Sequence, residues 1–125
     1  MNRIDKMLPH AVYAVQNEIA KKGIVDSAFN GYISSLGASI TMAGLLPTVI
    51  FFSEKGGSQA DRPAVVKSII YILRQTGDLR NDEKLTEKLL ALVRSNNNAE
   101  LSRIEELVTD AAIALKLAIR TFPKK

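Results

Sequence analysis

A long uncharged stretch in the first half of the chain is the feature that most constrains its fold. No charged residue occurs from Ser27 to Ser53, although charged residues make up 24% of the 125 residues. Apolar side chains recur there at helical spacing and so share one helix face: Phe29, Ile33, Leu36 and Ile40. Gly44 is typical of a helix end, and Pro47 suits the first turn of a next helix over Thr48–Glu54. The stretch therefore predicts a buried helical hairpin, around which the other helices pack.

The opposite face of this first hairpin helix carries small side chains: Ser34, Ser35, Ala38, Ser39 and Thr41. Small residues allow another element to approach closely, so we expect the helix to be enclosed on more than one side. A membrane-spanning helix needs ~20 mostly apolar residues without a break. Asn30, Gly44 and Pro47 interrupt the run, and no basic flank sets an orientation, so a soluble core hairpin is the preferred interpretation.

Length and composition predict one globular domain over residues 1–125 with a hydrophobic core of its own. Cysteine is absent, which excludes disulfides and thiolate chemistry. The charged start MNRIDKMLPH has no signal-peptide pattern, so we expect a cytoplasmic protein. The net charge of +4 lies wholly in residues 62–125, because residues 1–61 carry equal numbers of basic and acidic side chains. A basic second half suits an anionic partner.

Helical spacing continues outside the hairpin. Leu8, Val12, Val15 and Ile19 predict a first helix that ends near Lys21-Lys22-Gly23. Lys21 and Lys22 would there either complement the helix dipole or contact a ligand. A loop is expected over residues 53–60, after which Asp61 and Pro63 start a helix that ends at Gly77. Its predicted buried face is Val65, Val66, Ile69, Ile70 and Leu73.

Two more helices follow. Asn81-Asp82 is expected to cap the first, whose core face is Leu85, Leu89, Leu92 and Val93. On its other side Lys84 and Lys88 alternate with Glu83 and Glu87, which is typical of a solvated surface. Asn97 with Glu100 resembles a capping box for a last helix over Ala99–Arg120. A second apolar stripe on that helix (Leu107, Ile113, Leu117) is a candidate contact for another protein. No strand pattern occurs, so the predicted fold is all-α, a single compact bundle of five or six antiparallel helices.

A row of basic and aromatic side chains is the best local pattern for nucleic-acid contact. Lys67, Tyr71 and Arg74 are spaced i, i+4, i+7, opposite the apolar face of their helix. Cations reach phosphates, and a Tyr ring can stack on a base or donate its hydroxyl to the backbone. An ordinary solvated helix face explains the same pattern. Lys116 and Arg120, one turn apart, make the C-terminal end basic together with Lys124-Lys125.

Catalytic patterns are absent from the sequence. His10 is the single histidine, with neither a cysteine nor a carboxylate placed to orient it, so we expect a solvated side chain. Glu105, Glu106 and Asp110, with Arg103 nearby, are typical of a solvated face, and the Glu-x-x-His pairs of metal-binding bundles do not occur. We expect no catalytic residue, metal or cofactor.

A resemblance adds to this interpretation. The segment GYISSLGASITMAGLLPTVIFF (Gly31–Phe52) resembles the signature of the small subunit of the type III-B CRISPR effector, the Cmr complex. Tyr32, Gly44-Leu45 and Phe51-Phe52 occupy the places of that family's helix-leading Tyr, Asn-Gly-Leu turn and Ala-Phe-Leu motif. Ala114–Phe122 is similar to its closing basic-apolar helix. Ala43 in place of Asn and Leu36-Gly37 in place of Leu-Pro are departures.

The resemblance implies a non-catalytic subunit of an RNA-guided antiviral ribonucleoprotein. Such subunits stack along the backbone subunits, beside the large subunit and copies of themselves, and line the channel that holds guide RNA paired with target RNA. A-form RNA is held through phosphates and shape, which requires Lys and Arg on a rigid helical surface. On this basis the expected RNA contacts are Lys67, Tyr71, Arg74, Lys116, Arg120, Lys21 and Lys22. The alternative is a helical protein-interaction or DNA-binding regulatory module with no RNA partner.

Overall fold

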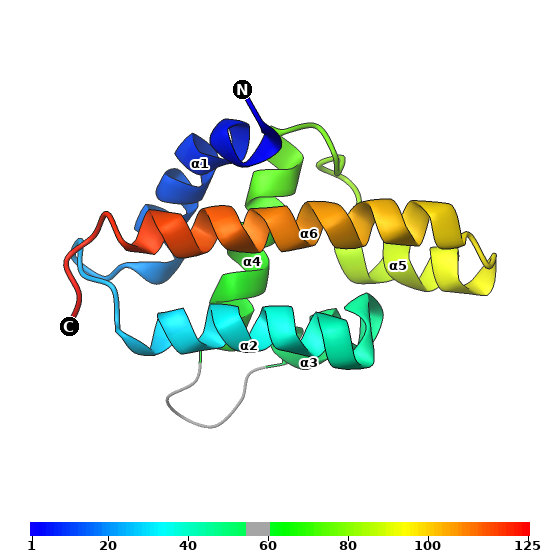
Figure 1. The fold of residues 1–125 in the computed structure, drawn as a ribbon, viewed down its shortest axis with the longest axis horizontal. Helices are drawn as coiled ribbons and strands as arrows, with labels where there is room; N and C mark the ends of the chain where they lie inside the picture. The colour runs from blue at the N-terminus through cyan, green and yellow to red at the C-terminus, as the bar shows by residue number, and fades with distance from the viewer. Residues whose placement is uncertain (55–60) are drawn as a thin grey trace.

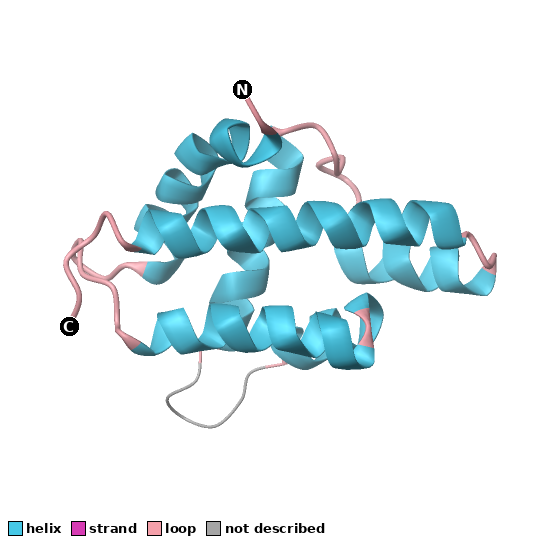
Figure 2. Ribbon diagram, in the orientation of Figure 1, coloured by secondary structure: helices cyan, strands magenta, loops and turns pink. Residues whose placement is uncertain are grey.

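The part of the chain that the structure describes folds into six α-helices (Figure 1). The structure is a computed structural model, and it describes residues 1–54 and 61–125. In chain order the elements are α1 (Arg3–Ala14), a π-helical turn η1 (Val15–Ile19), α2 (Ala28–Ala43), α3 (Leu45–Ser53), α4 (Arg62–Gln75), α5 (Leu85–Arg94) and α6 (Asn98–Ile119). The described residues contain isolated bridges but no strand (Figure 2), so the predicted all-α class is confirmed.

The helix α6 runs along the length of the molecule and packs against most of the others (Figure 1). It lies between α1 on one side and α2 on the other, with α4 crossing behind it and α5 alongside its N-terminal half. The most extensive of these contacts joins α1 and α6. Alanines are fully or almost fully buried on both helices (Ala11, Ala14, Ala111, Ala114 and Ala118). Small side chains allow the two helix axes to approach closely, which places α6 at the centre of the core.

The predicted hairpin is formed by α2 and α3, and its corner is Gly44. This residue has φ = 97°, a conformation that side-chain-bearing L-residues rarely adopt, and both helices begin or end beside it. Thr48, buried in the first turn of α3, donates its hydroxyl to the Gly44 carbonyl at 2.8 Å. The predicted core face of α2 is confirmed, since all four of its members are buried: Phe29, Ile33, Leu36 and Ile40. Val49 and Phe52 of α3 are buried as well.

The hairpin is buried on one face only. On α2 the small-residue face is exposed at Ser34, Ser35, Ala38 and Thr41, and Met42 is 88% exposed. The expectation that α2 is enclosed on more than one side is therefore wrong for the described chain. The reason is that serine and threonine hydroxyls are solvated well, so an uncharged helix face does not have to be covered.

Several helix ends follow their predicted signals. Asp61 accepts a hydrogen bond from the backbone N–H of Ala64 at 3.3 Å and caps α4. Asn97 accepts from the N–H of Glu100 at 3.2 Å and caps α6, whereas the Glu100 carboxylate binds Arg103. The loop expected at 53–60 falls largely on residues 55–60, which lie outside the described part of the chain.

Other boundaries differ from the prediction. The first helical segment ends at Ile19, so Lys21 and Lys22 lie beyond it in a tight turn and not in its last turn. Asn81-Asp82 does not cap α5, because that helix begins at Leu85 after Lys84, with no side-chain cap. Two apolar side chains also differ from their predicted burial. Val93, predicted on a core face, is 45% exposed, and Leu107, predicted on a surface stripe, is buried.

None of the helices in the described residues has the length and apolar character that crossing a membrane requires.

Candidate nucleic-acid interface

The predicted row on α4 lines a groove between α4 and the start of α5. Lys67, Tyr71 and Arg74 lie along one wall, and Lys84 with the first turn of α5 forms the other. The groove has a volume of about 430 Å³. Lys67 is exposed and makes no hydrogen bond or ion pair with any residue the structure describes. The helical spacing i, i+4, i+7 thus brings the three side chains to one surface. That this surface is concave was not predicted from the sequence.

Tyr71 is partly buried, and an aromatic neighbour occupies one face of its ring. The rings of Tyr13 and Tyr71 stack with their centroids 5.4 Å apart and an interplanar angle of 22°. Tyr13 lies on α1 and is exposed. This stack joins α1 to α4. It covers one face of the Tyr71 ring, so only the other face remains for stacking on a base.

Arg74 is anchored to the loop between α4 and α5. Its Nη2 donates a 2.9 Å hydrogen bond to the main-chain carbonyl of Glu83. Its Nε is buried and has no partner among the described residues. Because the guanidinium is a rigid planar fork of donors, anchoring one nitrogen restricts how the whole group can turn. Arg74 is therefore held at the groove by one donor, and its other donors are kept near that place.

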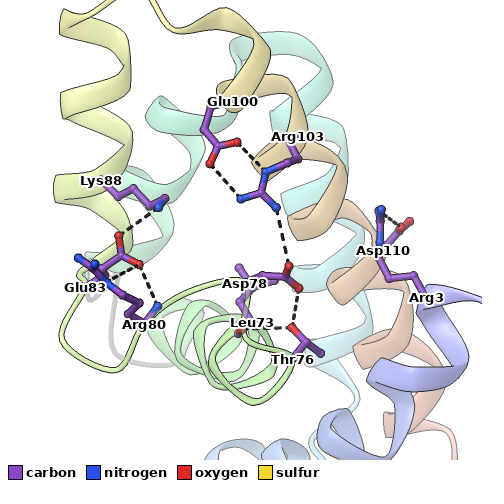
Figure 3. Close-up of polar contacts among 10 residues, drawn as sticks. All are labelled: Arg3, Leu73, Thr76, Asp78, Arg80, Glu83, Lys88, Glu100, Arg103 and Asp110. Carbon is purple, nitrogen blue, oxygen red and sulfur yellow. Dashed lines mark hydrogen bonds and ion pairs between the residues drawn. The ribbon is translucent and has the colours of Figure 1, made fainter.

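The same loop carries a compact set of ion pairs (Figure 3). Glu83 accepts from the Arg80 backbone N–H at 2.9 Å and pairs with Lys88 Nζ at 3.0 Å. The backbone hydrogen bond from Arg80, followed by the side-chain hydrogen bond from Lys88, lowers the pKa of Glu83 below its ordinary value. Glu83 and Lys88 are thus not the freely solvated pair that the sequence predicted, whereas Lys84 remains exposed at the groove.

A second set of ion pairs ties this loop to α6 (Figure 3). Arg103 binds Glu100 through two hydrogen bonds of 2.6 and 2.9 Å, and its Nη1 lies 3.7 Å from Asp78. Asp78 in turn accepts from the Thr76 hydroxyl at 2.7 Å. Hydrogen bonding to Arg103 lowers the pKa of Glu100. The loop is therefore held both to α5 and to α6.

The groove is not uniformly positive. Glu18 of η1 and Glu87 of α5 also line it. Glu87 is exposed and makes no ion pair with the described residues. Three cations, Lys67, Arg74 and Lys84, outnumber these two carboxylates. A polyanion would gain from the cations, and each carboxylate would reduce that gain.

A second basic site brings together Lys21, Lys22 and the end of the chain. Lys22 and Gly23 have φ of 54° and 76°, and two hydrogen bonds between Lys21 and Ile24 close the turn. The C-terminal segment pairs with this turn, since Val25 N–H donates to Pro123 and Lys125 N–H donates to Val25. The three lysines line a hollow of about 550 Å³ together with Asp26 and Asp61. Sequence spacing gave no sign of this contact.

The remaining predicted cations lie on α6. Lys116 is partly buried, and its Nζ donates to Ser34 Oγ of α2 at 2.6 Å. Arg120 is exposed at the C-terminal cap of the same helix. Lys84 and Lys125 were not among the predicted RNA contacts. The sequence placed Lys84 on a solvated helix face and Lys125 in the basic C-terminal end.

No group of three or more His, Asp or Glu side chains is arranged to hold a metal ion in the described ranges, 1–54 and 61–125. His10 is partly exposed on α1.

In a comparison with protein families, residues 4–118 match a model described as CRISPR-associated protein (Cas_Cmr5). No curated protein and no solved structure matches the chain.

Proposed function

Because the chain belongs to the Cmr5 family of CRISPR-associated proteins, we propose that it is the non-catalytic small subunit of a type III-B RNA-guided effector complex. The single observation that carries this proposal is the family match, which extends over residues 4–118 and so reaches from α1 almost to the end of α6. In this role the protein acts in antiviral defence in the cytoplasm, beside backbone subunits, the large subunit and further copies of itself.

The proposed ligand surface contacts phosphates of the guide RNA and target RNA without reading bases. Lys67, Arg74 and Lys84 supply three cations along one groove, mounted on helices whose ends are pinned by the loop between them. A-form RNA presents a regular array of phosphates, so a rigid cationic wall suits it. We propose further phosphate contacts outside this groove, at Lys21, Lys22, Lys116 and Arg120.

Protein contacts are proposed on the outer face of α6. Ile113 and Leu117 are 43% and 38% exposed and lie one turn apart. Leu107, which belonged to the same predicted stripe, is part of the core and is excluded from this face. The two exposed side chains are the part of the stripe available to a neighbouring subunit.

The test is affinity purification of the full chain from its native host, followed by identification of the co-purified proteins and sequencing of bound RNA. Guide RNA together with other subunits of the effector is the expected result. Ile113→Asp is expected to reduce the yield of the partner subunits, whereas Thr41→Asp, at an exposed position of α2, is the control. Recovery of DNA or of unrelated proteins without guide RNA would support a regulatory interaction module instead.

A further inference from the structure

Glu83 lies in the loop between α4 and α5 and accepts hydrogen bonds through both its side chain and its main chain. Its carboxylate accepts from the Arg80 N–H and from Lys88, at 2.9 and 3.0 Å (Figure 3). Its main-chain carbonyl accepts from Arg74 Nη2 at 2.9 Å. The side chain is 18% exposed. One acidic residue therefore joins α5, the loop and a groove cation of α4.

These contacts fix the direction of the carbonyl that holds Arg74. The Arg80 bond closes the turn over residues 80–83, and the Lys88 bond ties the same carboxylate to the body of α5. A carbonyl held this way presents its oxygen at one place, so Arg74 loses little orientational freedom when it binds an anion. Lys84, the next residue, lines the groove and takes its position from the same turn.

We propose that Glu83 is a positioning residue for phosphate binding at the groove, acting through Arg74. The inference rests on the proposed RNA contact of Lys67 and Arg74. The proposal and a simple charge argument predict opposite changes in RNA affinity when this carboxylate is removed. Removing a carboxylate beside a polyanion site strengthens binding if only charge matters, whereas removing the residue that orients a cation weakens it.

Glu87 provides the matched control. It lines the groove, lies four residues after Glu83, carries the same charge, and has no hydrogen bond or ion pair with the described residues. Glu83→Gln and Glu87→Gln each remove one negative charge, the first from the loop beside the groove and the second from its wall, so a difference in sign between their effects reports the contacts of Glu83.

The experiment titrates the full chain with an RNA duplex of mixed sequence over a series of salt concentrations. Glu87→Gln is expected to bind roughly 2-fold tighter, and Glu83→Gln roughly 2–5-fold weaker. Glu83→Gln should also reduce the slope of log affinity against log salt, as Arg74→Ala does, because one phosphate contact is lost. The double variant that combines Glu83→Gln with Arg74→Ala should bind no more weakly than Arg74→Ala alone. The reason is that the effects of two residues acting as one unit do not add. Thermal unfolding verifies that each variant is folded.

Several outcomes overturn the inference. Tighter binding by Glu83→Gln, as for Glu87→Gln, or additive effects of Glu83→Gln and Arg74→Ala, would remove the positioning role while leaving the RNA contact in place. If Arg74→Ala and Lys67→Ala both leave the affinity unchanged, the RNA contact itself is absent and both proposals fail. If Glu83→Gln does not fold, Glu83→Asp decides: it keeps the charge but shortens the reach, so weaker binding is expected and an unchanged affinity contradicts the role.

Discussion

Lys116 on α6 donates a 2.6 Å hydrogen bond from Nζ to Oγ of Ser34 on α2, across a separation of 82 residues. This bond connects the two helices at the surface and draws one predicted RNA contact toward the hairpin. An ammonium group has three N–H donors, so the contact with Ser34 leaves two for another acceptor. Lys116 can therefore hold its place on α2 and still bind a phosphate.

Ser34→Ala tests whether this contact matters for folding or for RNA. The free energy of unfolding is expected to change by less than about 0.5 kcal/mol, because the bond is at the surface. RNA affinity should fall less than in Lys116→Ala, which removes the charge itself. Chemical denaturation and RNA titration measure the two effects. Equal losses of affinity in both variants would mean that Ser34, and not the charge of Lys116, governs this contact.

The core of the hairpin gives a second prediction. Leu36→Ala removes a side chain that is 1% exposed and should lower the free energy of unfolding by about 2–5 kcal/mol, through lost burial and a residual cavity. Met42→Ala on the exposed side of the same helix is the control and should change it by less than about 0.5 kcal/mol. Urea denaturation measures both. A large loss for Met42→Ala in the isolated chain would mean that the exposed face of α2 is covered in solution.

Acid should weaken the contacts around the loop between α4 and α5. The pKa values of Glu83 and Glu100 are lowered in the folded chain, by the Arg80 and Lys88 hydrogen bonds and by Arg103 respectively. A carboxyl group with a lowered folded pKa stabilises the fold above its ordinary pKa of about 4.5. This contribution is lost as the pH falls from there through the lowered pKa.

Unfolding measured by denaturant between pH 7 and pH 3 checks this prediction. The decline in stability below about pH 4.5 should be shallower in a Glu83→Gln, Glu100→Gln double variant, because the two titrating groups are gone. Identical profiles for the double variant and the parent would show that these ion pairs contribute nothing to the pH dependence.

The proposed non-catalytic role predicts that His10 is dispensable. His10→Ala should leave the activities of the assembled effector unchanged, since the described structure places no activating group beside this side chain. Nuclease and nucleotidase assays on the purified chain and on the complex measure this. An activity of the isolated protein that disappears in His10→Ala would contradict the proposal.

Local signals in the sequence were sufficient for most of the fold. Helical spacing identified the buried faces of α2 and α4. Asp61 and Asn97 marked helix starts through their side-chain oxygens, and Gly44 marked a helix end through its backbone conformation. Periodicity does not tell whether a neutral face is covered, which is why the small-residue side of α2 was assigned to the interior. The hydroxyls there suit solvent and close packing equally.

The site was predictable only as a list of cations on helix faces. The stack of Tyr71 on Tyr13 and the pairing of the C-terminal segment with Val25 join positions far apart in the chain, and no local pattern specifies them. In the sequence, Glu83 and Glu87 are spaced i, i+4, and both were predicted on the same solvated helix face. Their difference arises from the turn over residues 80–83, which brings one carboxylate against Arg80 and Lys88.

The last prediction concerns how the groove holds RNA. Lys67 is exposed on its wall, so Lys67→Ala removes a phosphate contact without breaking a bond within the described chain. The affinity should fall similarly for all RNA sequences, and the salt slope should decrease by roughly 1. Lys6→Ala on α1, which removes an exposed lysine outside the groove, should leave the slope unchanged.

The titration is made with the free protein and with the assembled complex. Free subunits should bind weakly, because a few contacts per copy become strong only when several copies align along one strand. The loss in Lys67→Ala should therefore be larger in the complex, where every copy contributes the same missing contact. If Lys67→Ala and Lys6→Ala behave alike in both states, the groove is not the RNA surface. The hollow formed by Lys21, Lys22 and Lys125 is then the next surface to substitute, since it brings two of the predicted lysines together with a third from the end of the chain.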